Sequence, residues 1–202
     1  HRDLHSFPTR RSSDLAALGF SSWLIVFAAL KGGALAIVST SLFCLSMVVL
    51  YLASTLYHVS KNEVAKRRLK VFDHSAIFAL IAGSYTPFSL VGLGGAWGWS
   101  LFGVVWGLAL AGILFKLFFT GRFKIVSTLL YIAMGWLVLI AAKPMGRSLS
   151  TGTIAWLAAG GVLYTAGTLF YLNKKMPYSH AVWHLFVVAG TAAHGVAVAS
   201  LL

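Results

Sequence analysis

Seven long apolar stretches alternate with short polar or glycine-rich stretches along this chain. Most are about 17–25 residues long, which suits an α-helix that crosses the hydrocarbon core of a bilayer. A membrane β-barrel would instead show segments of about ten residues in which apolar and polar positions alternate. The pattern therefore predicts seven membrane-spanning helices, over residues 16–30, 33–57, 73–93, 98–119, 125–142, 153–172 and 180–202.

Composition supports an all-α integral membrane protein, a seven-transmembrane helix bundle. Of 202 residues, 59% are hydrophobic and 10% are charged, whereas a soluble domain carries about 25% charged residues. A soluble fold could not bury so much apolar surface. The single cysteine, Cys44, excludes an intramolecular disulfide and a cysteine-based zinc knuckle.

Residues 1–15, HRDLHSFPTRRSSDL, differ from the rest of the chain. They are polar and lack the apolar core of a signal peptide. They resemble translated sequencing-adapter sequence. We therefore expect residues 1–15 to be a non-native leader that replaces the native start, and residues 16–202 to form the membrane domain. His1 and His5 are therefore not expected to belong to a functional site.

The formal net charge of +12 raises the question of nucleic-acid binding. The basic residues lie in short connections between apolar stretches, where they contact anionic headgroups and set orientation, so no nucleic acid is expected. The connections after the second, fourth and sixth stretches hold ten of them and the other three connections hold three. This asymmetry predicts a cytoplasmic N-terminus. The ten are Lys61, Lys66, Arg67, Arg68, Lys70, Lys116, Arg122, Lys124, Lys174 and Lys175; the three are Lys31, Lys143 and Arg147.

With this orientation, three helices bring polar side chains to the cytoplasmic leaflet. The second stretch ends with Ser54 and His58, the third begins with Asp73, and the seventh begins with His180 and His184. Two histidines four residues apart share one face of a helix, about 6 Å apart along its axis. The spacing predicts that these side chains can meet at one depth.

Three histidines and a water form the arrangement of a catalytic zinc site. Zinc lowers the pKa of its bound water towards about 7 and polarises a substrate carbonyl. Asp73 would accept a hydrogen bond from that water or act as its general base. Ser54, one turn deeper than His58, would orient the water or stabilise an oxyanion. Three imidazoles favour zinc over iron or manganese.

Each residue also has a simpler interpretation. His58 and His180 could be interfacial side chains wetted by headgroups. Asp73 could be the N-cap of its helix, and Ser54 could bond back to a helix carbonyl. From the residues alone, these interpretations stay open beside the metal site.

Other polar residues are predicted to have structural roles. His194 lies about 21 Å along the helix from His180, too far to share a metal, so we expect it to form a hydrogen bond between helices. His74 points about 100° away from Asp73 and should support the site. Pro87, after Gly83–Thr86, should kink its helix, either for packing or to widen a cavity. Six glycines are expected at close helix contacts: Gly103, Gly107, Gly112, Gly160, Gly161 and Gly167.

Three motifs resemble the haemolysin III family, the bacterial branch of the progestin and adiponectin receptor superfamily. They are STLYH at 54–58, FDHSAIFALIAGSYTPF at 72–88 and HAVWHLFVVAGTAAH at 180–194. The resemblance covers nearly everything after residue 16. It implies a seven-helix bundle in the bacterial plasma (inner) membrane with zinc near the cytoplasmic face. The zinc ligands would be His58, His180 and His184, Asp73 would contact zinc through water, and Ser54 is the serine of the motif. Family members usually have a longer start before the first span.

The resemblance also suggests a reaction. The adiponectin receptors look like zinc-dependent ceramide hydrolases, and alkaline ceramidases are related, which favours hydrolysis of a lipid amide or ester. One alternative is a non-catalytic membrane sensor or receptor with a structural zinc. An open metal position beside a lipid-sized cavity would favour the enzyme. A cytolysin comes last, because seven apolar spans without a shielding domain do not permit a soluble form.

Overall fold

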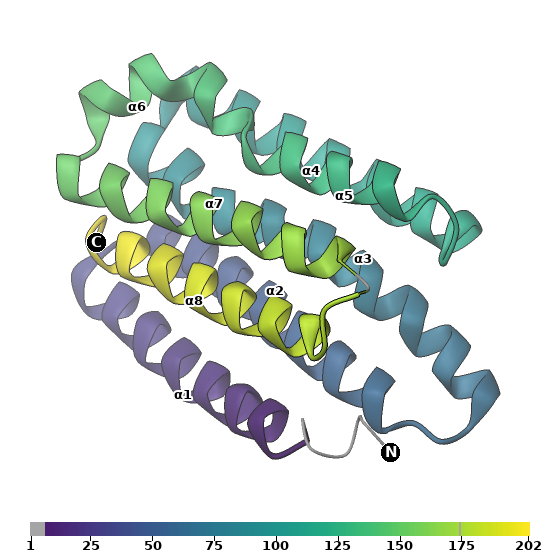
Figure 1. Cartoon of the computed structure of the whole chain (residues 1–202). Coiled ribbons are helices and arrows are strands. Elements are labelled where there is room, and N and C mark those ends of the chain that lie inside the picture. The colour runs from purple at the N-terminus through teal and green to yellow at the C-terminus, as the bar shows by residue number, and fades with distance from the viewer. Residues whose placement is uncertain (1–6, 174) are drawn as a thin grey trace.

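The computed structural model describes residues 7–173 and 175–202 as a bundle of long helices (Figure 1). Seven helical stretches are long and apolar enough to cross a membrane, and the described residues contain no β-strand. The predicted fold class is therefore confirmed. The helices are α1 (Phe7–Lys31), α2 (Ala34–Val59), α3 (Glu63–Pro87), α4 (Gly95–Phe119), α5 (Lys124–Gly135), α6 (Ala142–Ser148), α7 (Thr151–Leu172) and α8 (Ser179–Ala199), with a π-helix η2 (Phe88–Leu93) and a 3₁₀-helix η3 (Leu137–Ala141).

The spans pack in a closed ring. Neighbouring helices contact one another in the order α1, α2, α3, α4, α5, α7 and α8, and α8 also contacts α1. Successive helices run in opposite directions, so α2 ends at the same end of the bundle at which α3 and α8 begin (Figure 1). This arrangement brings the three sequence motifs together.

The third span begins ten residues earlier than the sequence pattern predicts. The side chain of Asn62 caps α3, because its Oδ1 accepts hydrogen bonds from the backbone N–H groups of Val64 and Ala65, at 3.0 Å each. Four of the five basic residues expected in this loop therefore lie on the first turns of α3, while Lys61 precedes it. Asp73 lies inside the helix, so its interpretation as an N-cap is wrong.

The first helix also begins earlier than expected. Residues 7–15 of the predicted leader are helical and continue into the first span. The span long and apolar enough for a membrane starts at Asp14. Residues 1–6, with His1 and His5, lie outside the described residues, and the foreign origin of the leader stays a prediction.

The fifth span is not the single helix predicted over 125–142. It consists of α5, η3 and α6 and extends to Ser148, with a break at Trp136. The Tyr85 hydroxyl lies at this break. Its single proton is shared between the carbonyls of Met134 and Gly135, at 2.9 and 2.7 Å, and its oxygen accepts from the N–H of Val138 at 2.8 Å. The tyrosine replaces hydrogen bonds that the broken helix cannot make within itself.

The third span continues past Pro87. The chain passes from α3 directly into η2, so the predicted interruption is a change of helix type. A proline removes one backbone donor, and a π-helical turn is one way to absorb this change. Ser84, Tyr85 and Phe88 from this segment line a cavity, described below.

Three of the six glycines lie where close packing was predicted. A Cβ at Gly112 would overlap the Phe78 ring, and one at Gly160 would overlap the His194 ring. At Gly167 a Cβ would lie 2.8 Å from the Cβ of Phe186. The prediction is wrong for Gly103 and Gly107, which are exposed and have no neighbour within 4 Å of such a Cβ. At Gly161 the Cβ would meet only Trp136, at 4.0 Å.

Candidate metal centre

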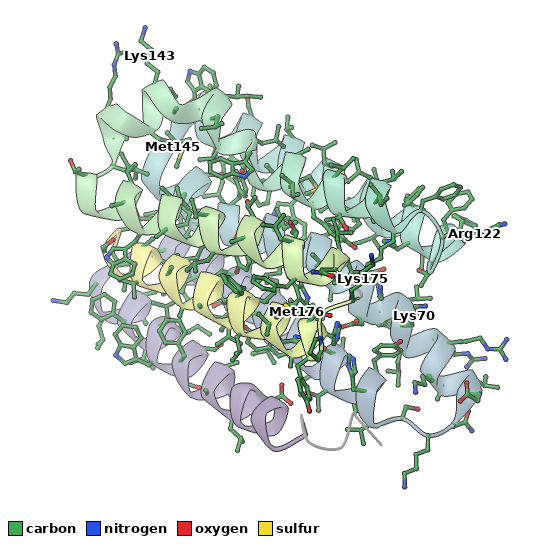
Figure 2. The ribbon with its side chains drawn as sticks, viewed as in Figure 1. Lys70, Arg122, Lys143, Met145, Lys175 and Met176 are labelled. Atoms are coloured by element: carbon green, nitrogen blue, oxygen red, sulfur yellow. The ribbon has the colours of Figure 1, made fainter. Side chains whose placement is uncertain are left out.

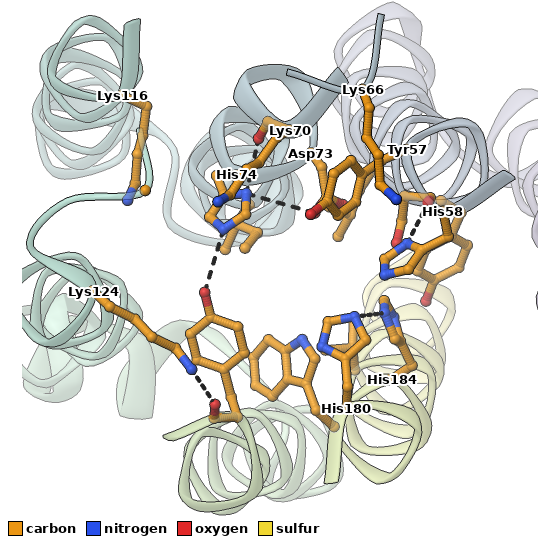
Figure 3. Close-up of a pocket in the computed structure, with 18 of the residues that line it drawn as sticks. Tyr57, His58, Lys66, Lys70, Asp73, His74, Lys116, Lys124, His180 and His184 are labelled. Atoms are coloured by element: carbon orange, nitrogen blue, oxygen red, sulfur yellow. Dashed lines mark hydrogen bonds and ion pairs between the residues drawn. The ribbon is translucent and has the colours of Figure 1, made fainter. Parts of the chain in front are cut away.

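The last turn of α2 and the first turns of α8 bring three histidines together. His58, His180 and His184 each offer one ring nitrogen, and these nitrogens lie within 4.8 Å of one another. The Nε2 atoms of His180 and His184 are 3.1 Å apart, and the His58 ring centroid lies 4.9 Å from that of His180. Figure 3 shows the rings turned towards one another. Interfacial histidines wetted separately by headgroups would not cluster in this way.

The donor set fits a zinc ion. Two imidazole nitrogens that share a tetrahedral zinc lie about 3.3 Å apart, because Zn–N distances are about 2.0–2.1 Å. The separations among the three nitrogens are close enough for small side-chain movements to reach that value. The Nδ1–H group of His58 donates to the carbonyl of Ser54 at 2.8 Å. Such a bond fixes the ring and makes Nε2 the nitrogen that takes a metal.

Asp73 lies on α3 and lines the same cavity as the histidines, with its side chain 13% exposed. Its Oδ2 atom is 3.6 Å from Nδ1 of His74. That Nδ1–H donates to the carbonyl of Lys70 at 2.8 Å, and Nε2 lies 3.4 Å from the hydroxyl of Tyr171. His74 therefore stands beside Asp73 and outside the three-histidine cluster, as a supporting residue would.

Ser54 is buried, 5% exposed, and lines the cavity one turn from His58. All five residues selected from the sequence thus border one space: His58 and Ser54 from α2, Asp73 from α3, and His180 and His184 from α8. Their approach follows from the antiparallel ring of helices.

This cavity has a volume of about 520 Å³. Its wall also contains Tyr171 and Trp183, which sequence reasoning did not select. A second cavity of about 220 Å³ follows α3 towards the other end of the bundle, and Ile77 and Trp183 border both cavities. The second cavity is mostly apolar. The sequence does not reveal this cavity, because most of the residues that line it look like ordinary core positions.

His194 borders the second cavity and forms the predicted bond between helices. Its Nε2–H donates to the carbonyl of Leu157 on α7, at 3.2 Å. The Tyr164 ring meets the His194 ring edge-on, with centroids 5.3 Å apart. His194 therefore joins α8 to α7 and takes no part in the cluster.

Comparison with known proteins now identifies the family. A sequence model described as "Haemolysin-III related" matches residues 13–195. This chain belongs to the haemolysin III family. It is 52% identical over 171 residues to the "Hemolysin-3 homolog" of Bacillus subtilis, a match that covers 85% of this chain and 80% of that protein. It is 47% identical over 169 residues to "Hemolysin-3" of Bacillus cereus, covering 84% of this chain and 77% of that protein.

A more distant relative comes from animals. The chain is 25% identical over 159 residues to the human "Monocyte to macrophage differentiation factor", covering 76% of this chain and 66% of that protein. The family predicted from the three motifs is thus confirmed, while the metal and the reaction stay predictions.

Proposed function

We propose that this protein is a zinc-dependent membrane hydrolase that cleaves a lipid amide or ester. One observation carries the proposal: three histidine nitrogens lie within 4.8 Å of one another on the wall of a cavity of about 520 Å³ that Asp73 also lines. A metal-binding group beside open space suits a substrate better than a closed structural site does.

The residues divide the chemistry among them. Zinc, held by His58, His180 and His184, would activate a water for attack and polarise the substrate carbonyl. Asp73 would accept a proton from the attacking water and return it to the leaving amine or alcohol. The Ser54 hydroxyl would donate a hydrogen bond to the oxygen on which negative charge develops. The carbonyl of Ser54 holds the His58 ring in place.

A lipid substrate suits the surroundings. The second cavity adjoins the first through Ile77 and Trp183 and offers an apolar space for an acyl chain. The ten-to-three asymmetry of basic residues favours a cytoplasmic position for the histidine end of the bundle. The site would then work at the cytoplasmic face of the bacterial plasma (inner) membrane. The cavity beside the three histidines favours a hydrolase over a sensor with a structural zinc.

The metal content of the detergent-purified protein tests the proposal. We expect about one zinc per chain, lost in His180→Ala and kept at least partly in Asp73→Ala, since Asp73 is placed outside the ligand set. His194→Ala is the matched control, because His194 lies outside the cluster. A folded wild-type protein without zinc would rule out the hydrolase.

A further inference from the structure

The cavity beside the histidines is strongly cationic. Among the described residues, one carboxylate, Asp73, lines it against five basic side chains, which leaves a formal excess of four positive charges. A cationic wall attracts an anionic ligand, whereas it gives a neutral lipid no such advantage. The basic side chains are Lys66, Lys70, Lys116, Arg122 and Lys124.

Lys116 on α4 is the most buried of these cations, 2% exposed. Its ammonium group donates to the hydroxyl of Ser127 on α5. A neutral hydroxyl satisfies one donor but does not balance the charge, and a buried charge is costly unless it is paired. An anion in the cavity would provide that balance.

Two further lysines, Lys70 and Lys124, lie at the cavity wall. The amine of Lys70 lies against the α4–α5 connection, 3.3 Å from where a Cβ on Gly121 would stand. The amine of Lys124 donates to the carbonyl of Tyr171 at 2.5 Å and lies 4.0 Å from the centroid of its ring. Cations from α3, α4 and α5 thus converge on one space.

Membrane orientation alone does not explain this convergence. Lys61, Arg67 and Arg68 are exposed at the same end of the bundle and suffice for a positive cytoplasmic face. Lys66 and Lys70, from the same stretch, are half-buried and line the cavity. Basic residues of one short stretch therefore fall into two groups: some are exposed at the surface and others line the cavity.

Two of the cavity lysines, Lys116 and Lys124, lie across the cavity from the three histidines. In Figure 3, His58, His180 and His184 lie on one side, together with Lys66, and Lys116 and Lys124 lie on the other. Lys70, Asp73 and His74 lie between them. We propose that the cavity binds a lipid whose headgroup carries a phosphate, held by Lys70, Lys116 and Lys124, with its acyl carbonyl towards the histidines. Lysine is a common phosphate ligand. Cleavage of this lipid rests on the proposed function, but its binding does not.

Binding to the full chain in a neutral detergent tests this assignment. The probes are dioctanoyl phosphatidic acid, dioctanoylglycerol and inorganic phosphate, measured by calorimetric titration. We expect phosphatidic acid to bind at least about tenfold more tightly than dioctanoylglycerol, and Lys70→Gln and Lys116→Gln each to raise its Kd about tenfold, the loss expected for one charge-assisted contact. Lys143→Gln is the control, because Lys143 lies at the opposite end of the bundle (Figure 2) and should leave the Kd unchanged.

Three results of these titrations would overturn all or part of the proposal. Equal affinity for the phosphatidic acid and the neutral lipid would overturn the proposal, as would an equal loss in Lys143→Gln. Inorganic phosphate that binds as tightly as phosphatidic acid would overturn the lipid part. Lys70 is half-buried, so its variant decides the question if Lys116→Gln does not fold. The preference should persist in His180→Ala, which separates this test from that of the zinc site.

Discussion

At the scale of single residues, the four-residue spacing in the STLYH motif has a direct physical cause. A helical residue reaches the carbonyl four positions before it, and Nδ1 of His58 uses the carbonyl of Ser54 in this way. His74 makes the same bond to Lys70. Any residue at position 54 could supply that carbonyl, so the bond to His58 does not require a serine. The role of the serine hydroxyl towards a substrate stays a prediction that this bond does not explain.

Asp73 allows the sharpest test at this scale. Asn has nearly the same shape but cannot take a proton, so Asp73→Asn should keep zinc and lower the hydrolysis rate by about 10²–10⁴-fold. The measurement is fatty-acid release from dioctanoyl phosphatidic acid and from a short-chain ceramide by the purified protein.

Glu63 is the matched control for Asp73. It lies on the same helix but is exposed in its first turn, so Glu63→Gln should leave the rate unchanged within about twofold. Equal rates for Asp73→Asn and the wild type would remove Asp73 from the reaction. A similar loss in Glu63→Gln would point to a general effect of charge.

At the scale of helices, the α7–α8 pair shows how small residues set a distance. Gly160 makes room for the His194 ring and Gly167 for Trp183 and Phe186, while Gly190 on α8 accommodates the Tyr164 ring. These contacts hold α8, which carries His180 and His184, against its neighbour. The geometry of the site therefore depends on glycines outside it.

Neighbouring glycines on α7 give a controlled test of this packing. Gly160→Ala would place a Cβ into the His194 ring and disturb its bond to Leu157, so we expect a loss of about 1–3 kcal/mol of stability and a lower Tm. Gly161→Ala has open space and better helix propensity, so its Tm should be equal or higher. Thermal unfolding in detergent measures both, and equal Tm values would contradict the packing role of Gly160.

The sequence predicts the spans well because apolar length is a strong signal, and it selects the five site residues because they stand out as polar at span ends. The start of α3 has a local cause, the Asn62 cap, but the basic residues that follow it hide the helix from an apolar-length signal. The break in the fifth span has a tertiary cause, because it depends on Tyr85, which is remote in sequence. The inward turn of Lys116 is equally hidden, since a lysine near a span end normally indicates only membrane orientation.

At the scale of the whole molecule, most of the basic residues and the three clustered histidines lie at one end of the bundle. In Figure 2, Lys70, Arg122 and Lys175 lie at the end opposite Lys143. The three histidines are at the end with the denser basic residues. If that end faces the cytoplasm, the cavity opens towards the leaflet in which anionic lipids are concentrated. Orientation therefore decides which lipids can reach the site.

Two serines at opposite ends of the bundle can decide the orientation. Cys44 is the one cysteine of the chain, and its replacement by serine removes the native thiol. Adding either Ser60→Cys, after α2, or Ser148→Cys, at the end of α6, then gives a protein with a single thiol at a known end of the bundle. The ten-to-three distribution of basic residues predicts that a membrane-impermeant maleimide labels Ser148→Cys in intact cells and Ser60→Cys only after permeabilisation. The reverse pattern would put the histidines and the cationic cavity outside the cell. The cavity would then receive phosphate lipids from the outer leaflet only, and the proposed action at the cytoplasmic face would fail together with the orientation.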